Sequence, residues 1–309
     1  MLNALLMIRQ IVAAVVFSLG ASVASAALDS AQIESLTGLK GTMNEAEAVF
    51  KITSPRTDVK IAVDGWSMPP FMGLTTWAAF TPGVKAEAMV AGDFVLFEDE
   101  VNAAMSAALD GGLSVTALHN HFFADDPKVY FMHIGGEGGT VKLATAVRAA
   151  LDAVKSVRAA QPQPQRVFGK AFAPASNALT AAPLDAALGA KGQVKDGMYK
   201  AVFGRTAKMP CGCDMAKEMG VNTWAAFAGT DDNAVVCGDF CVLEDELQPV
   251  LKTLRKEGIN IVAIHHHMTH EQPRYLFLHY WGKGHASGLA ASLKTTLETQ
   301  TKVPAAPTK

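Results

Sequence analysis

Residues 117–138 read ALHNHFFADDPKVYFMHIGGEG, a segment that alternates like a β-hairpin and carries three histidines. A relative of it, AIHHHMTHEQPRYLFLHYWGKG, returns at 263–284. Upstream, TTWAAF at 75–80 recurs as NTWAAF at 222–227, and GDFVLFEDEV at 92–101 recurs as GDFCVLEDEL at 238–247, with a constant offset of 146 from the Gly-Asp-Phe onward. This self-similarity indicates two tandem copies of one domain.

The length of the chain supports this organisation. It has 309 residues, half of them apolar, which is enough for two domains with cores of their own. We expect copy one at 27–158 and copy two at 184–300. The segment 159–183 is rich in Ala, Pro, Gln and Ser without a sustained helical or strand period, which is typical of a linker or crossing segment. Residues 301–309 are expected to form a flexible tail.

Each copy has the pattern of an α+β fold. In copy one, β-branched and aromatic content predicts strands at 48–53, 59–63, 75–80, 86–97, 114–122 and 128–134. A helix is predicted at 98–112 from its acidic first turn and its glycine end, and a second at 140–157. Copy two repeats the order, with its first helix at 244–258. The fold class is therefore α+β: two tandem similar domains, each a mainly antiparallel sheet covered by helices, related by a pseudo-twofold axis.

The amino terminus predicts export. Residues 1–26 combine an early arginine, Arg9, an apolar run and a small-residue ending at Ala26, the pattern of a secretory signal peptide cut after Ala26. We therefore expect a periplasmic or secreted protein. Later stretches lack the roughly 20 continuous apolar residues of a span, so no stable membrane anchor is expected. After cleavage, 26 Lys+Arg oppose 29 Asp+Glu, and this net charge of -3 disfavours a nucleic-acid partner.

The repeated histidines predict a metal site in each copy. Alternate residues of a strand point to one face, so two histidines per copy project together, and the hairpin return brings a third beside them. Three imidazoles can hold zinc or copper, and we expect one of these as the cofactor. The predicted ligands are His119, His121 and His133 in copy one and His265, His267 and His279 in copy two.

A purely structural role is the alternative, because neighbouring histidines can also hydrogen-bond one another and nearby acids without a metal. The pattern of identity favours the metal. Between 114–138 and 260–284 eight positions are identical, and three of them are histidine although histidine is only 9 of 309 residues.

Acidic triplets follow the Gly-Asp-Phe strand at 98–100 and 244–246. Carboxylates in the first turn of a helix are favoured by the helix dipole, which explains most of them. One glutamate in each copy could instead complete a metal shell or act as a general base on metal-bound water, and for this catalytic role we select Glu98 and Glu244.

All four cysteines lie in copy two, in MPCGCDM at 209–215 and CGDFC at 237–241. An even number of cysteines in an oxidising compartment favours disulfides, and we expect a bridge between the two clusters. The alternative is a soft copper(I) site formed by Met209, Cys211, Cys213 and Met215.

The doubled combination of Gly-Asp-Phe-x-x-x-Glu-Asp-Glu at 92–100, Ala-Leu-His-Asn-His at 117–121, Pro127, and Phe-x-His-x-x-Gly-x-Gly at 131–138 resembles the LppY/LpqO family of bacterial secreted proteins and lipoproteins. The resemblance covers nearly the whole mature chain and implies no activity. The chain lacks a cysteine near the predicted cleavage site, so amino-terminal lipid anchoring is not expected.

Three functions remain open. The first is an exported protein that handles or senses metal ions through a histidine-rich site in each repeat. The second is a metal-dependent hydrolase of the cell envelope, and the third is a non-catalytic envelope protein that binds a small-molecule ligand in a groove lined by structural histidines. The sequence favours the first.

Overall fold

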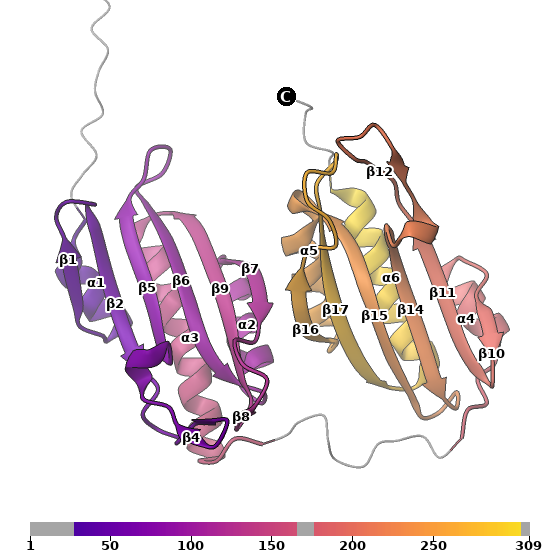
Figure 1. Cartoon of the computed structure of the whole chain (residues 1–309), viewed down its shortest axis with the longest axis horizontal. Coiled ribbons are helices and arrows are strands. Elements are labelled where there is room, and N and C mark those ends of the chain that lie inside the picture. The colour runs from indigo at the N-terminus through magenta and orange to yellow at the C-terminus, as the bar shows by residue number, and fades with distance from the viewer. Residues whose placement is uncertain (1–27, 166–175, 304–309) are drawn as a thin grey trace, which may run out of the picture.

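The structure is a computed structural model that describes residues 28–165 and 176–303. The predicted signal peptide at 1–26 lies outside the described residues, as do 166–175 of the predicted crossing segment and 304–309 of the predicted tail. The described part of the chain forms one antiparallel sheet of twelve strands with helices packed against one face (Figure 1).

Copy one supplies one half of this sheet, in the spatial order β1-β2-β5-β6-β9-β7. The strands are β1 (Gly41–Asn44), β2 (Val49–Pro55), β5 (Thr75–Pro82), β6 (Ala88–Phe97), β9 (Val129–Gly138) and β7 (Ser114–His119). Its helices are α1 (Ser30–Thr37), α2 (Val101–Asp110) and α3 (Thr140–Ala160). The short strands β3 (Ala62–Val63), β4 (Trp66–Ser67) and β8 (Asp125–Asp126) form a separate small sheet, and η1 (Pro70–Met72) precedes β5.

Copy two supplies the other half, in the mirrored order β16-β17-β15-β14-β11-β10. These strands are β16 (Asn260–His265), β17 (Tyr275–Gly284), β15 (Ala234–Leu243), β14 (Asn222–Gly229), β11 (Met198–Gly204) and β10 (Gln193–Lys195). Its helices are α4 (Ala181–Leu188), α5 (Glu244–Lys256) and α6 (Ala286–Lys302). A hairpin of β12 (Ala207–Lys208) and β13 (Asp214–Met215) and the short helix η2 (Lys217–Met219) lead into β14.

The two halves join where β7 pairs with β16, at Leu118 and Ile264. The hydrogen bonds beside this pair are equivalent in the two copies, as a pseudo-twofold axis requires. The side-chain oxygen of Asn102 accepts from the N–H of Ile261, at 3.1 Å, and the equivalent oxygen of Gln248 accepts from the N–H of Val115, at 2.9 Å. Both N–H groups lie at β-bulges, where the ladder leaves a donor to be satisfied by another group.

The side-chain alternation of the strands separates two faces. On β6, Phe94 and Leu96 enter the main core beneath the helices, whereas Val95 and Phe97 belong to a smaller apolar cluster under the 59–74 segment. Asp93 has the same parity as Val95 and therefore lies on the face away from the helices. We call this helix-free side of the large sheet the open face.

The predicted fold class is confirmed: the chain is α+β, with a mainly antiparallel sheet and two similar repeats. Several features differ from the prediction. The strand expected at 59–63 is reduced to β3 in a separate small sheet, and the strand expected at 114–122 ends at His119. The two expected sheets are continuous through β7 and β16, and the helix expected from residue 98 begins at Val101. Among the described residues, no helix is both long and apolar enough to cross a membrane.

Candidate metal-binding site on the open face

A row of three side-chain types crosses the open face in each copy. In copy two, Trp224 on β14 is the cross-strand partner of Asp239 on β15, and Asp239 is the partner of His279 on β17. Copy one repeats the row as Trp77, Asp93 and His133. Because directly paired residues of antiparallel strands project from the same face, each aspartate stands between a tryptophan and a histidine.

In copy two the other two predicted histidines reach this row. The ring centroids of His265 and His279 are 4.9 Å apart, and those of His265 and His267 are 5.0 Å apart. His267 Nε2 lies 3.1 Å from His265 Nε2 and 3.3 Å from Asp239 Oδ2. One ligand atom each from Asp239, His265 and His267 lies within 4.8 Å of the others, and within the described residues this is the single group of three with that property.

A backbone carbonyl orients the ring of His279, which stacks on His265. Its Nδ1 lies 3.2 Å from the carbonyl oxygen of Gly238, so an Nδ1–H that donates to this oxygen leaves Nε2 as the free acceptor. A backbone carbonyl that orients an imidazole in this way is the usual support of a metal-ligating histidine.

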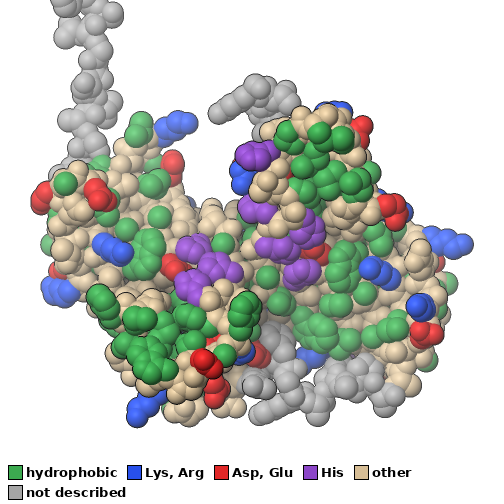
Figure 2. Space-filling view, viewed as in Figure 1, with side chains coloured by type: hydrophobic (Ala, Val, Ile, Leu, Met, Phe, Trp, Pro, Cys, Tyr) green, Lys and Arg blue, Asp and Glu red, His purple; other side chains and the backbone are tan. Residues whose placement is uncertain are grey.

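Copy one brings its three histidines together with different side-chain contacts. The rings of His119 and His133 are stacked at 5.1 Å, with their Nε2 atoms 3.0 Å apart. His121 stacks on the other side, 5.2 Å from His119. All six predicted ligands are thus gathered, three in each copy, and Figure 2 shows the histidines in neighbouring groups on one face of the molecule.

An aromatic ring supports the last histidine of each set. His121 lies flat on Phe131, with ring centroids 3.3 Å apart, and His267 lies on Phe277 at 3.5 Å. Both phenylalanines are fully buried. The repeated Phe-x-His spacing of β9 and β17 therefore supplies both a ligand candidate and the surface that holds another histidine in place.

The electrostatics of the aspartates favour a cation. Asp239 is 1% exposed and its Oδ1 has no hydrogen-bond partner; Asp93 is 9% exposed and its Oδ1 is likewise unpartnered. Burial raises the pKa of Asp239 above its ordinary value, and His279 and His267 oppose this rise. A buried carboxylate without a full set of partners is costly, and a bound cation removes that cost.

Burial also acts on His265. It lowers the pKa of His265 to about 4, with further lowering by His279, His267 and His266. This imidazole is therefore neutral at physiological pH, which is the form that binds metal.

The selected glutamates lie elsewhere. Glu98 and Glu244 are each five residues beyond the aspartate of their strand, roughly 16 Å along an extended chain. Glu244 is exposed and its Oε1 lies 3.8 Å from Arg274, and Glu98 is half-buried near Tyr130, whose pKa rises through burial and through the charge of Glu98. Neither belongs to the group of ligand atoms around Asp239.

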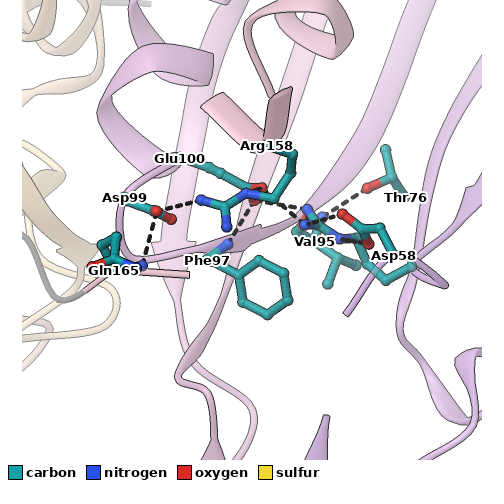
Figure 3. A network of polar contacts seen from close by, with 9 residues as sticks. Asp58, Thr76, Val95, Phe97, Asp99, Glu100, Arg158 and Gln165 are labelled. Carbon is teal, nitrogen blue, oxygen red and sulfur yellow. Dashed lines mark hydrogen bonds and ion pairs between the residues drawn. The ribbon is translucent and has the colours of Figure 1, made fainter. Parts of the chain in front are cut away.

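The third residue of each acidic triplet is structural. Glu100 is fully buried and accepts two hydrogen bonds from Arg56, at 2.7 and 2.8 Å, and one from the N–H of Phe97 at 2.8 Å. Arg158 joins the same network from α3 through Glu100 and Asp99 (Figure 3). In copy two Glu246 pairs with Arg205 and accepts from the N–H of Leu243 as in a capping box. These carboxylates hold the helix starts against the sheet.

The predicted disulfide between the two cysteine clusters is not formed. All four cysteines are free. Cys241 is buried in an apolar cluster with Tyr275 and Phe277, whereas Cys211 and Cys213 are exposed on the β12–β13 hairpin, so the clusters lie in different environments. Within the hairpin the N–H of Cys213 donates to Cys211 Sγ at 3.4 Å. The soft copper(I) site with Met209 and Met215 stays a prediction.

The aspartates are the site residues that the sequence reasoning missed, although both belong to the repeated Gly-Asp-Phe. The apolar pattern of the strand could have identified them. A single charged residue inside a run as apolar as AMVAGDFVLF needs a partner, and its parity sets it on the face opposite Phe94.

Geometry and sequence together define the class: a duplicated α+β protein whose open sheet face carries an aspartate and three histidines in each repeat. The chain belongs to the family described as Domain of Unknown Function (DUF1259), which matches residues 31–153 and 182–299 and so confirms the tandem duplication. No curated protein matches the chain. A solved structure similar to it is that of a trimeric bacterial microcompartment shell protein PduB, with 12% identity and a TM-score of 0.23, over 84% of this chain and 90% of that chain. A score this low supports no inference.

Proposed function

We propose that this protein is an exported metal-binding protein, which handles or senses a transition-metal ion through an aspartate and three histidines in each repeat. The observation that carries the proposal is the group of Asp239, His265 and His267, whose ligand atoms lie within 4.8 Å of one another around a buried carboxylate. The counterparts of these three residues in copy one are Asp93, His119 and His121, and His133 stands where copy two has His279. Within the described residues the copy-two group alone meets this distance.

The donor set selects the kind of metal. Imidazole nitrogens with one carboxylate oxygen suit zinc or copper(II), whereas magnesium and calcium prefer sets made of oxygen atoms. We therefore propose zinc or copper as the ion. Binding without hydrolysis fits the site better than catalysis does, because Glu244, the selected general base of copy two, is exposed and lies outside the ligand group.

The metal test compares variants within one short segment. His265 and His267 project into the site, while His266 between them has its Nδ1 3.2 Å from the carbonyl oxygen of Tyr275. We expect H265A/H267A to lose the metal of copy two in elemental analysis after zinc or copper loading and dialysis, and H266A to keep it. Equal metal content in both variants, each folded by circular dichroism, would show that the histidines are structural.

Export is proposed from the sequence alone. The signal-like pattern of residues 1–26 and the resemblance to the LppY/LpqO family support a periplasmic or secreted protein. Intact mass of protein recovered from the periplasm should correspond to a chain that begins at Ala27. A mass that retains residues 1–26 would overturn this part of the proposal.

A further inference from the structure

A polar groove of about 460 Å³ opens beside the candidate site of copy two. We call it the lysine groove; its lining includes Lys191, Lys200, Lys217, Trp224, Asp239 and His267. Two of the three grouped ligand residues thus form part of its wall. A molecule that fills the groove would touch both the lysines and the proposed metal site.

The groove carries positive charge that the protein leaves largely unpaired. Lys200 forms no ion pair within the described residues and its ammonium lies 4.5 Å from the centroid of the Trp224 ring. Lys217 contacts its neighbour Glu218 at 3.1 Å, but both side chains are more than half exposed and such pairs are weak. Asp239, the other acidic residue in the wall, faces the histidines.

The equivalent lysine of copy one has an acidic partner in the same repeat. Lys40 and Lys191 each precede a glycine that packs on the aromatic ring of Phe50 or Tyr199, so they correspond. Lys40 forms an ion pair with Glu34 at 2.7 Å. Glu34 also accepts a hydrogen bond from the N–H of Gly41, and its counterpart Asp185 accepts the matching one from Gly192 and a second one from Tyr199. Lys191 acts on Asp185 through its charge, without a close ion pair in the part of the chain that the structure describes.

The short 3-10 helices η1 and η2 also differ: Pro70 and Phe71 of copy one stand where copy two has Lys217 and its acidic neighbour Glu218. The Lys–Trp contact is shared, because Lys51 lies 4.4 Å from the Trp77 centroid in copy one. Beside a contact that both copies possess, copy two has gained Lys217 with its acidic neighbour Glu218, and its Lys191 has no counterpart of the close Lys40–Glu34 ion pair within the described residues. This difference favours an anionic ligand at copy two.

We propose that the lysine groove binds a small anion, a carboxylate or a phosphate, with its charge on Lys191, Lys200 and Lys217 and its other end at Asp239 and His267. The contact with the metal rests on the proposed function, whereas the contact with the lysines does not. The volume is in the range of pockets for small molecules, and charge-assisted contacts to several ammonium groups supply both affinity and selection for anions.

The test titrates the full-length mature chain with succinate and with inorganic phosphate by calorimetry, with and without bound zinc. The variants are K200A and K217A, and the matched control is K51A, which removes the corresponding lysine of copy one. All three lysines are exposed, so the substitutions leave the core intact.

We expect at least one anion to bind, with its Kd raised about tenfold or more in K200A and K217A and unchanged within twofold in K51A. The anion that binds more tightly identifies the ligand as a carboxylate or a phosphate. Failure of both anions to bind the wild type at millimolar concentration, or an equal effect of K51A and K200A, would overturn the inference.

Elemental analysis of the same samples separates the two proposals. Retained zinc without anion binding contradicts the lysine groove and leaves the metal site standing. Anion binding without retained zinc contradicts the metal site and supports the lysine contacts.

Discussion

At the scale of single residues, the buried aspartate has a role that packing alone does not explain. Asp239 is 1% exposed, has one unpartnered oxygen and has a raised pKa because of its burial. A residue kept for stability would have its polar atoms satisfied. Asp239 therefore resembles a functional group whose cost to the folded protein is compensated when a ligand binds.

The D239N variant separates a ligand-binding role of Asp239 from a stabilising one. D239N removes the buried charge, so we expect the metal-free protein to unfold at an equal or higher temperature while zinc or copper binding in copy two weakens at least tenfold. Differential scanning calorimetry and metal titration measure the two effects. The control is D245N, which alters an exposed carboxylate in the first turn of α5 and should change neither. A lower Tm of metal-free D239N would indicate a structural aspartate.

The cysteines should react with an alkylating reagent in a defined order. The hydrogen bonds from Cys213 lower the pKa of the exposed Cys211 thiol, whereas burial raises the pKa of Cys241 to about 12. Because the thiolate is the reactive form, we expect iodoacetamide at neutral pH to modify Cys211 first and Cys241 only after unfolding. Peptide mass spectrometry on a time course measures this order. Early modification of Cys241 in the folded protein would contradict its placement.

A site residue could be predicted from the sequence where a local pattern identifies it, and could not where only the pairing of distant strands does. The histidines were predictable because both copies repeat the spacing, but His121 and His267 lie two residues beyond the ends of β7 and β16 and not on the expected strands. The aspartates share the site only through cross-strand register, Asp239 opposite His279, and register between strands 40 residues apart is not encoded locally. The sequence predicted the catalytic carboxylates at Glu98 and Glu244 instead, because they belong to the adjacent repeated acidic triplets.

At the scale of elements, the seam between copies depends on two side chains at the starts of the central helices. Asn102 on α2 and Gln248 on α5 each satisfy the bulged strand of the other copy. Gln248 also donates from Nε2 to the carbonyl oxygen of Val115 at 2.9 Å. The bulges and the pairing of β7 with β16 could not be predicted from the sequence, because nothing in either strand alone distinguishes it from an ordinary edge strand.

Truncation of Gln248, which bonds across the β7–β16 junction, should therefore lower the free energy of unfolding. Q248A leaves the N–H and C=O of Val115 without partners, and we expect about 1–3 kcal/mol less unfolding free energy in urea titrations. N102A, which removes a single acceptor, should cost less. The matched control is Q193A on the edge strand β10, where the side chain is exposed, and it should leave stability unchanged. An unchanged Q248A would contradict the continuous sheet.

The helix start of α5 should make the fold sensitive to acid. Burial would raise the pKa of Glu246, but hydrogen bonds from Arg205, Gln300 and Leu243 outweigh it and hold the pKa below the ordinary 4.5. A depressed carboxyl pKa contributes stability that is present above about pH 4.5 and lost as the pH falls through the folded value.

Gln in place of Glu246 tests this linkage. E246Q should lower the unfolding free energy at pH 7 by about 1–3 kcal/mol, because it removes the charged partner of Arg205. The difference from the wild type should shrink steadily as the pH falls below 4.5, since the wild-type group is then protonated too. A difference that stays constant between pH 7 and pH 3 would mean that Glu246 does not carry a depressed pKa.

The larger elements were predicted with fair accuracy and the small ones were not. Length and β-branched or aromatic content marked β5, β6 and β9, and the repeat of an acidic first turn and a glycine end marked α5. Strands of two to four residues such as β1 and β10, and the eight-residue helices α1 and α4, were missed. Segments of this length contain too few periods for a pattern, and their structure depends on tertiary packing.

At the scale of the whole molecule, duplication places two sets of one aspartate and three histidines on one face of one sheet. Each set of ligand candidates comes from a single copy: β6, β7 and β9 supply copy one, and β15, β16 and β17 supply copy two. The repeat spacing predicted this duplication directly. The sequence left open whether the copies form one shared site or two; in the structure each histidine triplet has its own aspartate and its own supporting phenylalanine, which favours two.

Two separate sites predict a stoichiometry. We expect the wild type to bind two zinc or copper ions per chain, and H121A or H267A alone to reduce this to about one, since each removes a ligand from a different copy. The double variant should bind none tightly. Acidification should release the ions, because protons compete with metal for imidazole. Inductively coupled plasma analysis gives the ratio. Near-complete loss in either single variant would mean that the copies share one ion across the pseudo-twofold, and the two copies would then act as halves of a single centre.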